Sequence, residues 1–266
     1  RSAGAADASP SASDLSGAEG TETSGSSGTE SRPTHPAATS APNEPAALPD
    51  IETPQRVEIP GVTHVWQKWN NCGPASVLMA LSAHHIHLDQ RAVAAVLKPN
   101  GNDTNVSPGE LAGFARQQGK AAIVRYGVDQ TTVKRLTALG LPVIVEHWVD
   151  VEGRGAMGHY RVVIGYDDDA RHFLVQDSYY GSRRAYGYDE FAAMSRPFSG
   201  AYVAIYPAER ELAVRAALGD AWDAAANVDA VRRQMEAETA QRPDDRWAWF
   251  SLGEMRSKQG EHAGAV

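Results

Sequence analysis

Cysteine is nearly absent from this chain of 266 residues, whose only thiol is that of Cys72. A single cysteine excludes an intrachain disulfide and any metal site built from several cysteines. Long apolar runs are also missing, because no stretch approaches the roughly 20 residues that a transmembrane helix needs. Basic residues are outnumbered, with 25 Lys and Arg against 33 Asp and Glu and a formal net charge of −8. This balance argues against nucleic acid as a partner.

The first 50 residues lack aromatic side chains, and Leu15 and Leu48 are their only large apolar residues. A segment dominated by Ala, Ser, Gly, Thr, Pro and Glu buries too little surface to offset the entropy of ordering. We therefore predict a disordered leader over residues 1–56. Such leaders commonly tether exported domains, which favours an extracytoplasmic or envelope-associated location. The chain starts at Arg1 without a signal segment, and we expect earlier processing or trimming.

From about residue 57 the composition becomes that of a globular domain with helices first. Ser107 at an N-cap, Pro108 at the first helical position and Glu110 at the third form a capping box that opens one of these helices. Gly119 closes it. The other segments with helical spacing are 73–84, 90–98 and 131–140, and residues 121–127 read as a strand.

Strand patterns follow the helices in the sequence. β-Branched and aromatic runs separated by turn residues predict strands over 141–149, 159–167, 173–178 and 200–207. The acidic cluster 167–169 is interpreted as a solvated hairpin turn. Helices followed by an antiparallel sheet indicate an α+β domain over residues 57–207.

Residues 208–266 are Ala-rich, with helical patterns and no strand patterns. Leu218-Gly219 recurs 34 residues later as Leu252-Gly253, and Gly260 lies where a turn between helices is needed. The period resembles that of tetratricopeptide repeats, with a second repeat that is incomplete at Val266. The alternative is chance similarity between Ala-rich helices. One and a half repeats do not form a stable array, so we expect the native protein to continue.

The position of Cys72 favours a nucleophile over an inert buried thiol. It directly precedes the helix predicted over 73–84, and a helix N-terminus lowers the pKa of a cysteine. Gly73 permits close backbone approach, and Pro74 suits the first turn. The backbone N–H of Cys72 and the side chain of Gln67 are candidate donors to an oxyanion. Trp66 and Trp69 flank this glutamine and either line a cleft or pack the start of the domain.

A thiol nucleophile needs a histidine base and a group that orients it. His159 begins a predicted strand beside Gly158, and Asp177 ends the next strand. Adjacent antiparallel strands bring these ends together, although Asp177 could also be an ordinary strand-end cap. His147 is interpreted as a core or edge residue. The HHIH run at 84–87 lies too far along its helix to reach the thiol and lacks the usual spacing of metal ligands, so no metal is expected.

The motifs QKWNNCGPASVLMAL, GHYRVVIGYDDD, FLVQDSYYG and YDEF together resemble the C39-like family of papain-fold cysteine peptidases. The resemblance covers about residues 58–207. It implies that Cys72 is the nucleophile, His159 the base and acid, Asp177 the orienting residue and Gln67 the oxyanion donor. Gln67 precedes the cysteine by five residues rather than the six usual in papain-like enzymes, and the neighbouring Asn70 and Asn71 are alternative donors.

The resemblance predicts cysteine-dependent hydrolysis of a peptide or amide bond through a thioester, without a cofactor. The substrate is a peptide or protein, and the C-terminal repeats are expected to bind a protein partner. Family members that cut bacteriocin leaders are usually fused to an export ATPase; since the chain shows no phosphate-binding loop, that substrate is not inferred. The alternatives are an acyl transferase or amidase that uses the same thioester, and a catalytically idle adaptor that acts through the repeats.

Overall fold

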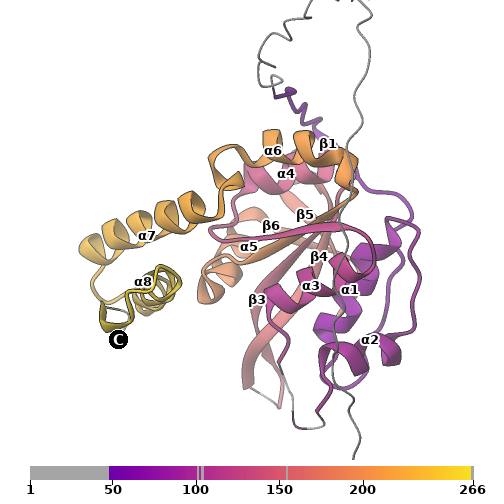
Figure 1. Cartoon of the computed structure of the whole chain (residues 1–266), viewed down its shortest axis with the longest axis horizontal. Coiled ribbons are helices and arrows are strands. Elements are labelled where there is room, and N and C mark those ends of the chain that lie inside the picture. Colours follow the sequence, from indigo (N-terminus) through magenta and orange to yellow (C-terminus); the bar gives the residue numbers. More distant parts are fainter. Residues whose placement is uncertain (1–47, 101, 103–104, 154, 265–266) are drawn as a thin grey trace, which may run out of the picture. The chain divides into compact units, whose positions relative to one another are not determined.

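The computed structural model describes residues 48–264 apart from 101, 103–104 and 154 (Figure 1). The predicted leader therefore lies outside the described residues except for residues 48–56. Strands and helices follow one another in the order β1 (Arg56–Glu58), α1 (Cys72–Ser82), α2 (Gln90–Leu97), α3 (Pro108–Gln117), β2 (Ala121–Arg125), α4 (Gln130–Ala138), β3 (Val143–Val151), β4 (Gly155–Asp167), β5 (His172–Asp177), β6 (Gly181–Gly187), α5 (Tyr188–Ser195), β7 (Tyr202–Tyr206), α6 (Glu211–Leu218), α7 (Ala224–Gln241) and α8 (Arg246–Lys258).

The strands form one antiparallel sheet in the order β2-β7-β3-β4-β5-β6, and the short β1 pairs with the far end of β4. The long β3–β4 hairpin sets the register of the sheet, with His147 opposite His159. A register shift between Val163 and Gly165 interrupts the pairing of β4 with β5. A side chain on Gly165 would collide with the backbone of β1, because its Cβ would lie 2.2 Å from the carbonyl oxygen of Val57.

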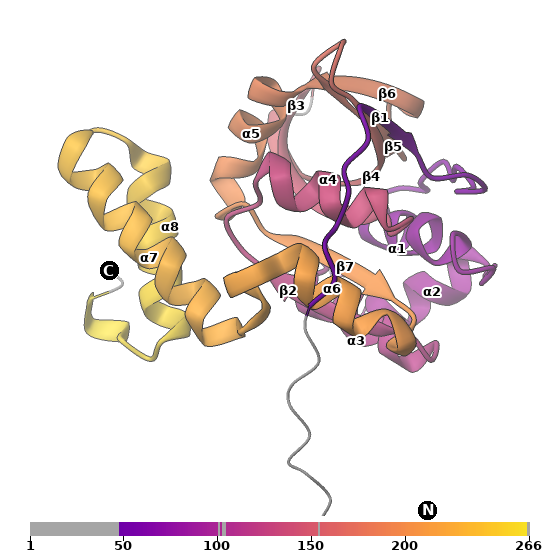
Figure 2. The same ribbon diagram turned by 90° about the horizontal axis from the view of Figure 1, so that it is seen from above.

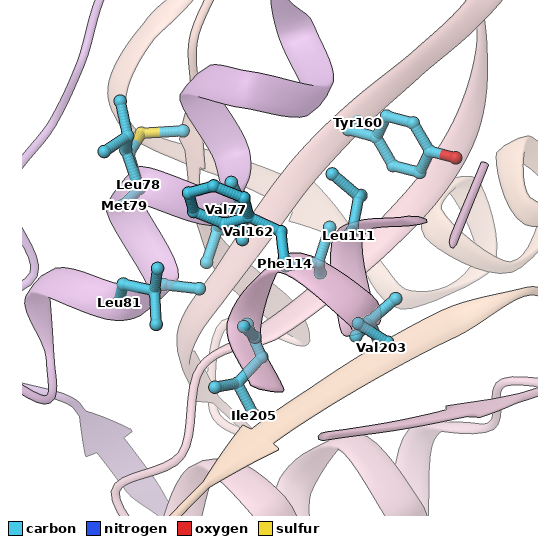
Figure 3. Close-up of a cluster of buried hydrophobic side chains, with 14 of the residues drawn as sticks. Val77, Leu78, Met79, Leu81, Leu111, Phe114, Tyr160, Val162, Val203 and Ile205 are labelled. Carbon is cyan, nitrogen blue, oxygen red and sulfur yellow. The ribbon is translucent and has the colours of Figure 1, made fainter. Parts of the chain in front are cut away.

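Helices cover both faces of this sheet (Figures 1 and 2). Successive side chains of a strand point to opposite faces, so Ile144 packs with α1, α2 and α3 while Val143 and Val145 pack with α4, α5 and α6. Figure 3 shows part of the first of these two cores and labels side chains of α1, α3, β4 and β7: Val77, Leu78, Met79, Leu81, Leu111, Phe114, Tyr160, Val162, Val203 and Ile205. This core holds α1 against the sheet and so places Cys72, the first residue of α1, beside His159 and Tyr160 of β4.

The predicted α+β arrangement is confirmed over most of its length. The helices lie within a few residues of their expected ranges, and the capping box of α3 forms with both of its reciprocal hydrogen bonds between Ser107 and Glu110. Three elements were not predicted, namely β1, β6 and α5. The strand expected to begin at 159 instead begins at Gly155, because residues 155–158 continue the pairing with β3.

The acidic turn at 167–169 differs from the expectation of a solvated turn. Asp167 is only 8% exposed and forms an ion pair with Arg56. Asp168 pairs with Lys134 and accepts a hydrogen bond from the Tyr188 hydroxyl. The prediction was wrong for these two residues because β1 and α4, which are distant in the sequence, pack over the turn and bring cations to it.

The segment after β7 is helical, as predicted, and α7 and α8 lie side by side (Figure 2). The two Leu-Gly pairs occupy different places, since Gly219 ends α6 with a φ of 56° whereas Gly253 lies within α8. Gly260 follows α8 with a φ of 83°, at the predicted turn. A tetratricopeptide array therefore stays a prediction. Within the described residues, none of the helices combines the length and the apolar character required to cross a bilayer.

Candidate active site

A cleft of about 640 Å³ lies where three segments distant in the sequence meet. The segment before α1 forms one side, the outer half of the β3–β4 hairpin forms another, and the turn after β5 completes it. The residues that line the cleft are Gln67, Lys68, Trp69, Asn70, Cys72, Val149, Val151, Met157, Gly158, His159, Tyr179 and Tyr180. Cys72 and His159 thus face a common space that is open to a ligand.

Cys72 is the first residue of α1, and its side chain is half-buried. At the next position the chain closely approaches the segment that precedes α3, where a Cβ on Gly73 would lie 3.1 Å from Cβ of Val106. Pro74 occupies the first turn, where its missing N–H costs no helical hydrogen bond. The thiol therefore sits at the positive end of the helix dipole, next to backbone N–H groups that point out of the helix.

His159 and Asp177 are in direct contact, as the strand pattern predicted. Nε2 of His159 lies 2.9 Å from Oδ1 of Asp177, and these side chains are 6% and 0% exposed. A carboxylate accepts the Nε2–H of the imidazole, which leaves Nδ1 to face Cys72. The row of thiol, imidazole and carboxylate matches the order of groups in an acyl-transfer site.

Opposing effects act on the pKa of the Cys72 thiol. Burial raises this pKa, but a hydrogen bond to His159, the charge of its imidazole and backbone hydrogen bonds from Tyr160 and Gly73 outweigh burial and lower it. For His159, burial lowers the pKa, while hydrogen bonds to Asp177 and Cys72 and the charges of both groups raise it above the ordinary value. The thiolate and the imidazolium thus stabilise each other.

Asp177 is held by donors on both of its oxygens. Oδ1 accepts the backbone N–H groups of Tyr179 and Tyr180, each at 2.9 Å, in addition to His159. Oδ2 accepts Nε of Arg161 at 2.7 Å and the hydroxyl of Tyr186 at 3.2 Å. Burial raises the pKa of this carboxyl, but its bonds to His159 and Arg161 lower it well below its usual range. The group stays ionised beside the imidazole.

Gln67 lies at the cleft and is tied to the end of β5 at two points. Its backbone N–H donates to the carbonyl of Ser178 at 2.9 Å, and its Oε1 accepts the Ser178 hydroxyl at 2.8 Å. With Oε1 engaged there, the amide NH₂ is the end that can donate toward a ligand. Of the two alternative donors, Asn70 lines the cleft, whereas Asn71 is buried and its amide lies 3.4 Å from Oε1 of Gln90.

Sequence reasoning missed Arg161 and underrated His147. Both side chains are buried, and NH1 of Arg161 lies 2.9 Å from Nδ1 of His147. The available signal was the spacing of two residues between His159 and Arg161, which puts both on one face of β4. A charged residue inside an otherwise apolar strand needs a buried partner, and Asp177 is that partner.

The histidines at 84–87 lie outside the cleft, as expected. Nε2 of His84 is 3.1 Å from the carbonyl oxygen of Ile205 on β7, which fixes this ring against the sheet. Across the described part of the chain, no group of three or more His, Cys, Asp or Glu side chains is arranged to hold a metal ion.

Comparison with known proteins identifies a family. Residues 58–206 match the Peptidase_C39 like family. A comparison with curated proteins finds no match.

Several solved structures are similar at low sequence identity. A C39-like peptidase from Bacillus anthracis shares 16% identity at a TM-score of 0.45, covering 56% of this chain and 96% of its own. The peptidase domain of Streptococcus ComA, a bi-functional ABC transporter, shares 18% identity at a TM-score of 0.45, and the match covers 55% of this chain and 98% of that domain. Xylellain, a cysteine protease from Xylella fastidiosa, shares 13% identity at a TM-score of 0.43, and the match covers 61% of this chain and 87% of xylellain.

Proposed function

Because this chain belongs to the Peptidase_C39 like family, we propose that it is a cysteine peptidase whose catalytic residues are Cys72, His159 and Asp177. The observation that carries the proposal is the continuous row from the thiol through the imidazole to a buried carboxylate, with the 2.9 Å contact between His159 and Asp177. This row opens on a cleft large enough for several residues of a peptide.

The reaction proceeds in two halves. His159 takes the proton of Cys72, and the thiolate attacks the carbonyl carbon of the scissile bond. The imidazolium then protonates the leaving nitrogen as the C–N bond breaks, which leaves a thioester on Cys72. Water, deprotonated by His159, attacks the thioester carbon and releases the carboxylic acid and the thiol. Asp177 keeps the imidazole in the tautomer and orientation that both halves require.

The negative oxygen of each tetrahedral intermediate is stabilised by two donors. The backbone N–H of Cys72 is one, because it belongs to the first turn of α1. The amide NH₂ of Gln67 is the other, supported by its position in the cleft and by the Ser178 bond that orients it. Asn70 is the alternative donor, because it also lines the cleft.

Two other functions remain as competing proposals. An acyl transferase would form the same thioester and pass it to an amine or hydroxyl instead of water. An adaptor would use the C-terminal helices, where Trp249 and Phe250 are 51% and 55% exposed, and would bind a protein through tetratricopeptide-like packing without catalysis. The lowered pKa of Cys72 favours the peptidase and the acyl transferase over the adaptor, since an idle site has no need of a thiolate.

The Cys72→Ala variant tests the proposal. We expect the unaltered protein to cleave members of a peptide library, and the variant to lose this activity while keeping its circular dichroism spectrum and thermal midpoint. Iodoacetamide modification followed against pH provides a second readout, because Cys72 is the only thiol. Alkylation at pH 6 no faster than that of free cysteine, together with no cleavage by either protein, would contradict the enzyme and leave the adaptor. Product that carries an added amine instead of a free carboxylate would identify the transferase.

A further inference from the structure

Arg161 is a buried cation directly behind the pair of His159 and Asp177. It lies on β4 with its side chain 2% exposed and is absent from the lining of the cleft. Its Nε donates to Oδ2 of Asp177 at 2.7 Å, and its guanidinium carbon lies 4.4 Å from the ring centroid of Tyr186. It thus cannot touch a substrate, yet it contacts the group that orients the base.

His147 fixes the other end of the guanidinium. Arginine can only donate hydrogen bonds, so the 2.9 Å contact makes Nδ1 of His147 an acceptor and places the ring proton on Nε2. Burial and the charge of Arg161 both lower the pKa of His147 well below its ordinary value, which keeps the ring neutral. The ring stands edge-on to Phe191, 4.5 Å between centroids. His147 therefore acts as a rigid neutral acceptor that sets the plane of the guanidinium.

We propose that Arg161 is a positioning residue that keeps Asp177 ionised and directed at His159. This inference rests on the proposed peptidase function. Arg161 and Tyr186 occupy Oδ2, while the backbone N–H groups of Tyr179 and Tyr180 occupy Oδ1, so the carboxylate is oriented before the imidazole binds it.

Charge balance is the second part of the role. The charged or titratable groups around Asp177 come from the segment before α1, from α1, β3, β4 and β6, and from the turn after β5: His64, Cys72, His147, His159, Arg161, Tyr179, Tyr180 and Tyr186. Burial raises the pKa of Tyr186 to about 12 and also raises that of Tyr180, so both hydroxyls are neutral. The charges of the thiolate, imidazolium, carboxylate and guanidinium then sum to zero. Without the guanidinium, forming the thiolate would leave the buried site with net negative charge, which is unfavourable.

The test is the pH dependence of iodoacetamide modification at Cys72 in the full chain, measured with Arg161→Met. We expect the midpoint of alkylation to move to higher pH by about one pH unit, as for the loss of a charge near a titrating group. The direction holds whether Asp177 stays charged or takes up a proton. In the first case a negative site resists the thiolate, and in the second the imidazolium loses the carboxylate that stabilises it. In both cases kcat/KM for peptide cleavage falls.

Two variants control for structural damage. Arg161→Lys keeps the charge but cannot bridge Asp177 and His147, so it should restore much of the alkylation midpoint but not kcat. Arg125→Met removes another buried guanidinium, which is 8% exposed and bound to the backbone carbonyls of Ala221 and Trp222, and should leave the midpoint unchanged in folded protein.

The outcomes separate this inference from the proposed function. If the unaltered protein alkylates with an ordinary thiol profile and cleaves no peptide, the peptidase proposal fails. If its profile lies at low pH and Arg161→Met leaves that profile in place, the peptidase proposal stands and the role of Arg161 is overturned. A shift of equal size in Arg125→Met would also overturn it, because the effect would then come from general loosening of the fold.

Discussion

At the scale of single residues, the protonation state of each group in the candidate site depends on its neighbours. Cys72 owes its lowered pKa to His159 and to backbone hydrogen bonds, and His159 owes its raised pKa largely to Asp177. Asp177 in turn is held by Arg161 and by main-chain N–H groups. A change at any one of these positions should therefore alter the titration of the others.

Replacing Asp177 by Asn should lower kcat on the order of 10²–10⁴-fold, because the imidazole loses the partner that fixes its tautomer. The pKa of His159 should fall, since its bond to Asp177 and the charge of that group now raise it. The high-pH limb of kcat/KM, where the imidazolium is lost, should then move to lower pH. A pH–rate profile measures this shift.

Asp168→Asn is the matched control for that substitution. Asp168 is also a carboxylate with low exposure, bonded to Lys134 and to the Tyr188 hydroxyl in the turn between β4 and β5. Its loss should reduce stability and leave the pH–rate profile in place. An unchanged high-pH limb in Asp177→Asn would contradict the role assigned to Asp177.

At the scale of elements, β3 carries different chemistry on its two faces. His147 faces the second core, while the preceding Glu146 lines a cavity of about 390 Å³ shared with Glu254 and Lys258 of α8. Burial raises the pKa of Glu146 to about 7, opposed by a hydrogen bond with Tyr160 and reinforced by the charge of Glu254. The contact between β3 and α8 thus contains an acid that resists ionisation.

The sign of the resulting stability change follows from this pKa. The folded protein binds the Glu146 proton more tightly than the unfolded chain, whose glutamates titrate near the ordinary value of 4.5. Glu146 therefore contributes stability at low pH that is lost as the pH rises toward about 7. Glu146→Gln removes this dependence, so its thermal midpoint should exceed that of the unaltered protein by a few degrees at pH 8. The gain should shrink at pH 5.

Thermal unfolding at the two pH values checks the prediction, with Glu209→Gln at an exposed residue as the control. The control should change the midpoint little at either pH. Equal midpoint changes at pH 5 and pH 8 in Glu146→Gln would show that Glu146 does not titrate with a raised pKa.

At the scale of the whole molecule, the C-terminal helices are attached to the part of the chain that matches the peptidase family. The ring centroids of Trp247 of α8 and Trp148 of β3 lie 5.6 Å apart, and Val149, the residue after Trp148, lines the cleft. Arg196 after α5 forms ion pairs with Glu238 and Asp245. We expect α7, α8 and the sheet to unfold together, in one transition.

Asn227→Ala tests this attachment. Asn227 is 5% exposed, accepts the backbone N–H of Tyr126 at 2.9 Å and donates to its carbonyl at 3.0 Å. Loss of both bonds should lower the free energy of unfolding by about 1–3 kcal/mol, because polar backbone groups lose their partners. Urea titrations followed by tryptophan fluorescence and by peptide cleavage should shift together.

Gln234→Ala provides the comparison for Asn227→Ala. Gln234 lies on the same helix but is exposed, and its side-chain amide donates a hydrogen bond to Oε1 of Glu238 at 3.0 Å. The free energy of unfolding of the Gln234→Ala variant should stay within about 0.5 kcal/mol of that of the unaltered protein. Loss of the α7 and α8 signal before cleavage activity would show that the helices unfold independently.

Much of the fold was predictable because its signals are local. Ser107 and Glu110 predict the start of α3, and the continuous apolar run around Ile144 predicts a strand, which the structure buries on both faces. The misses have a non-local cause. β6 is polar along much of its length and is a strand only because β5 lies beside it. Asp167 and Asp168 are paired with cations only because β1 and α4, which are distant in the sequence, lie beside the turn.

The sequence by itself determined the helix that begins at Cys72, the strands that carry His159 and Asp177, and their order, because these depend on nearest neighbours along the chain. Only the tertiary structure decided what surrounds the carboxylate. Arg161 was not singled out from the sequence, and His147 was interpreted as a core or edge residue. Packing removes water from both, and an unpaired buried charge is costly, so the fold must bring a carboxylate to the guanidinium and a neutral acceptor behind it.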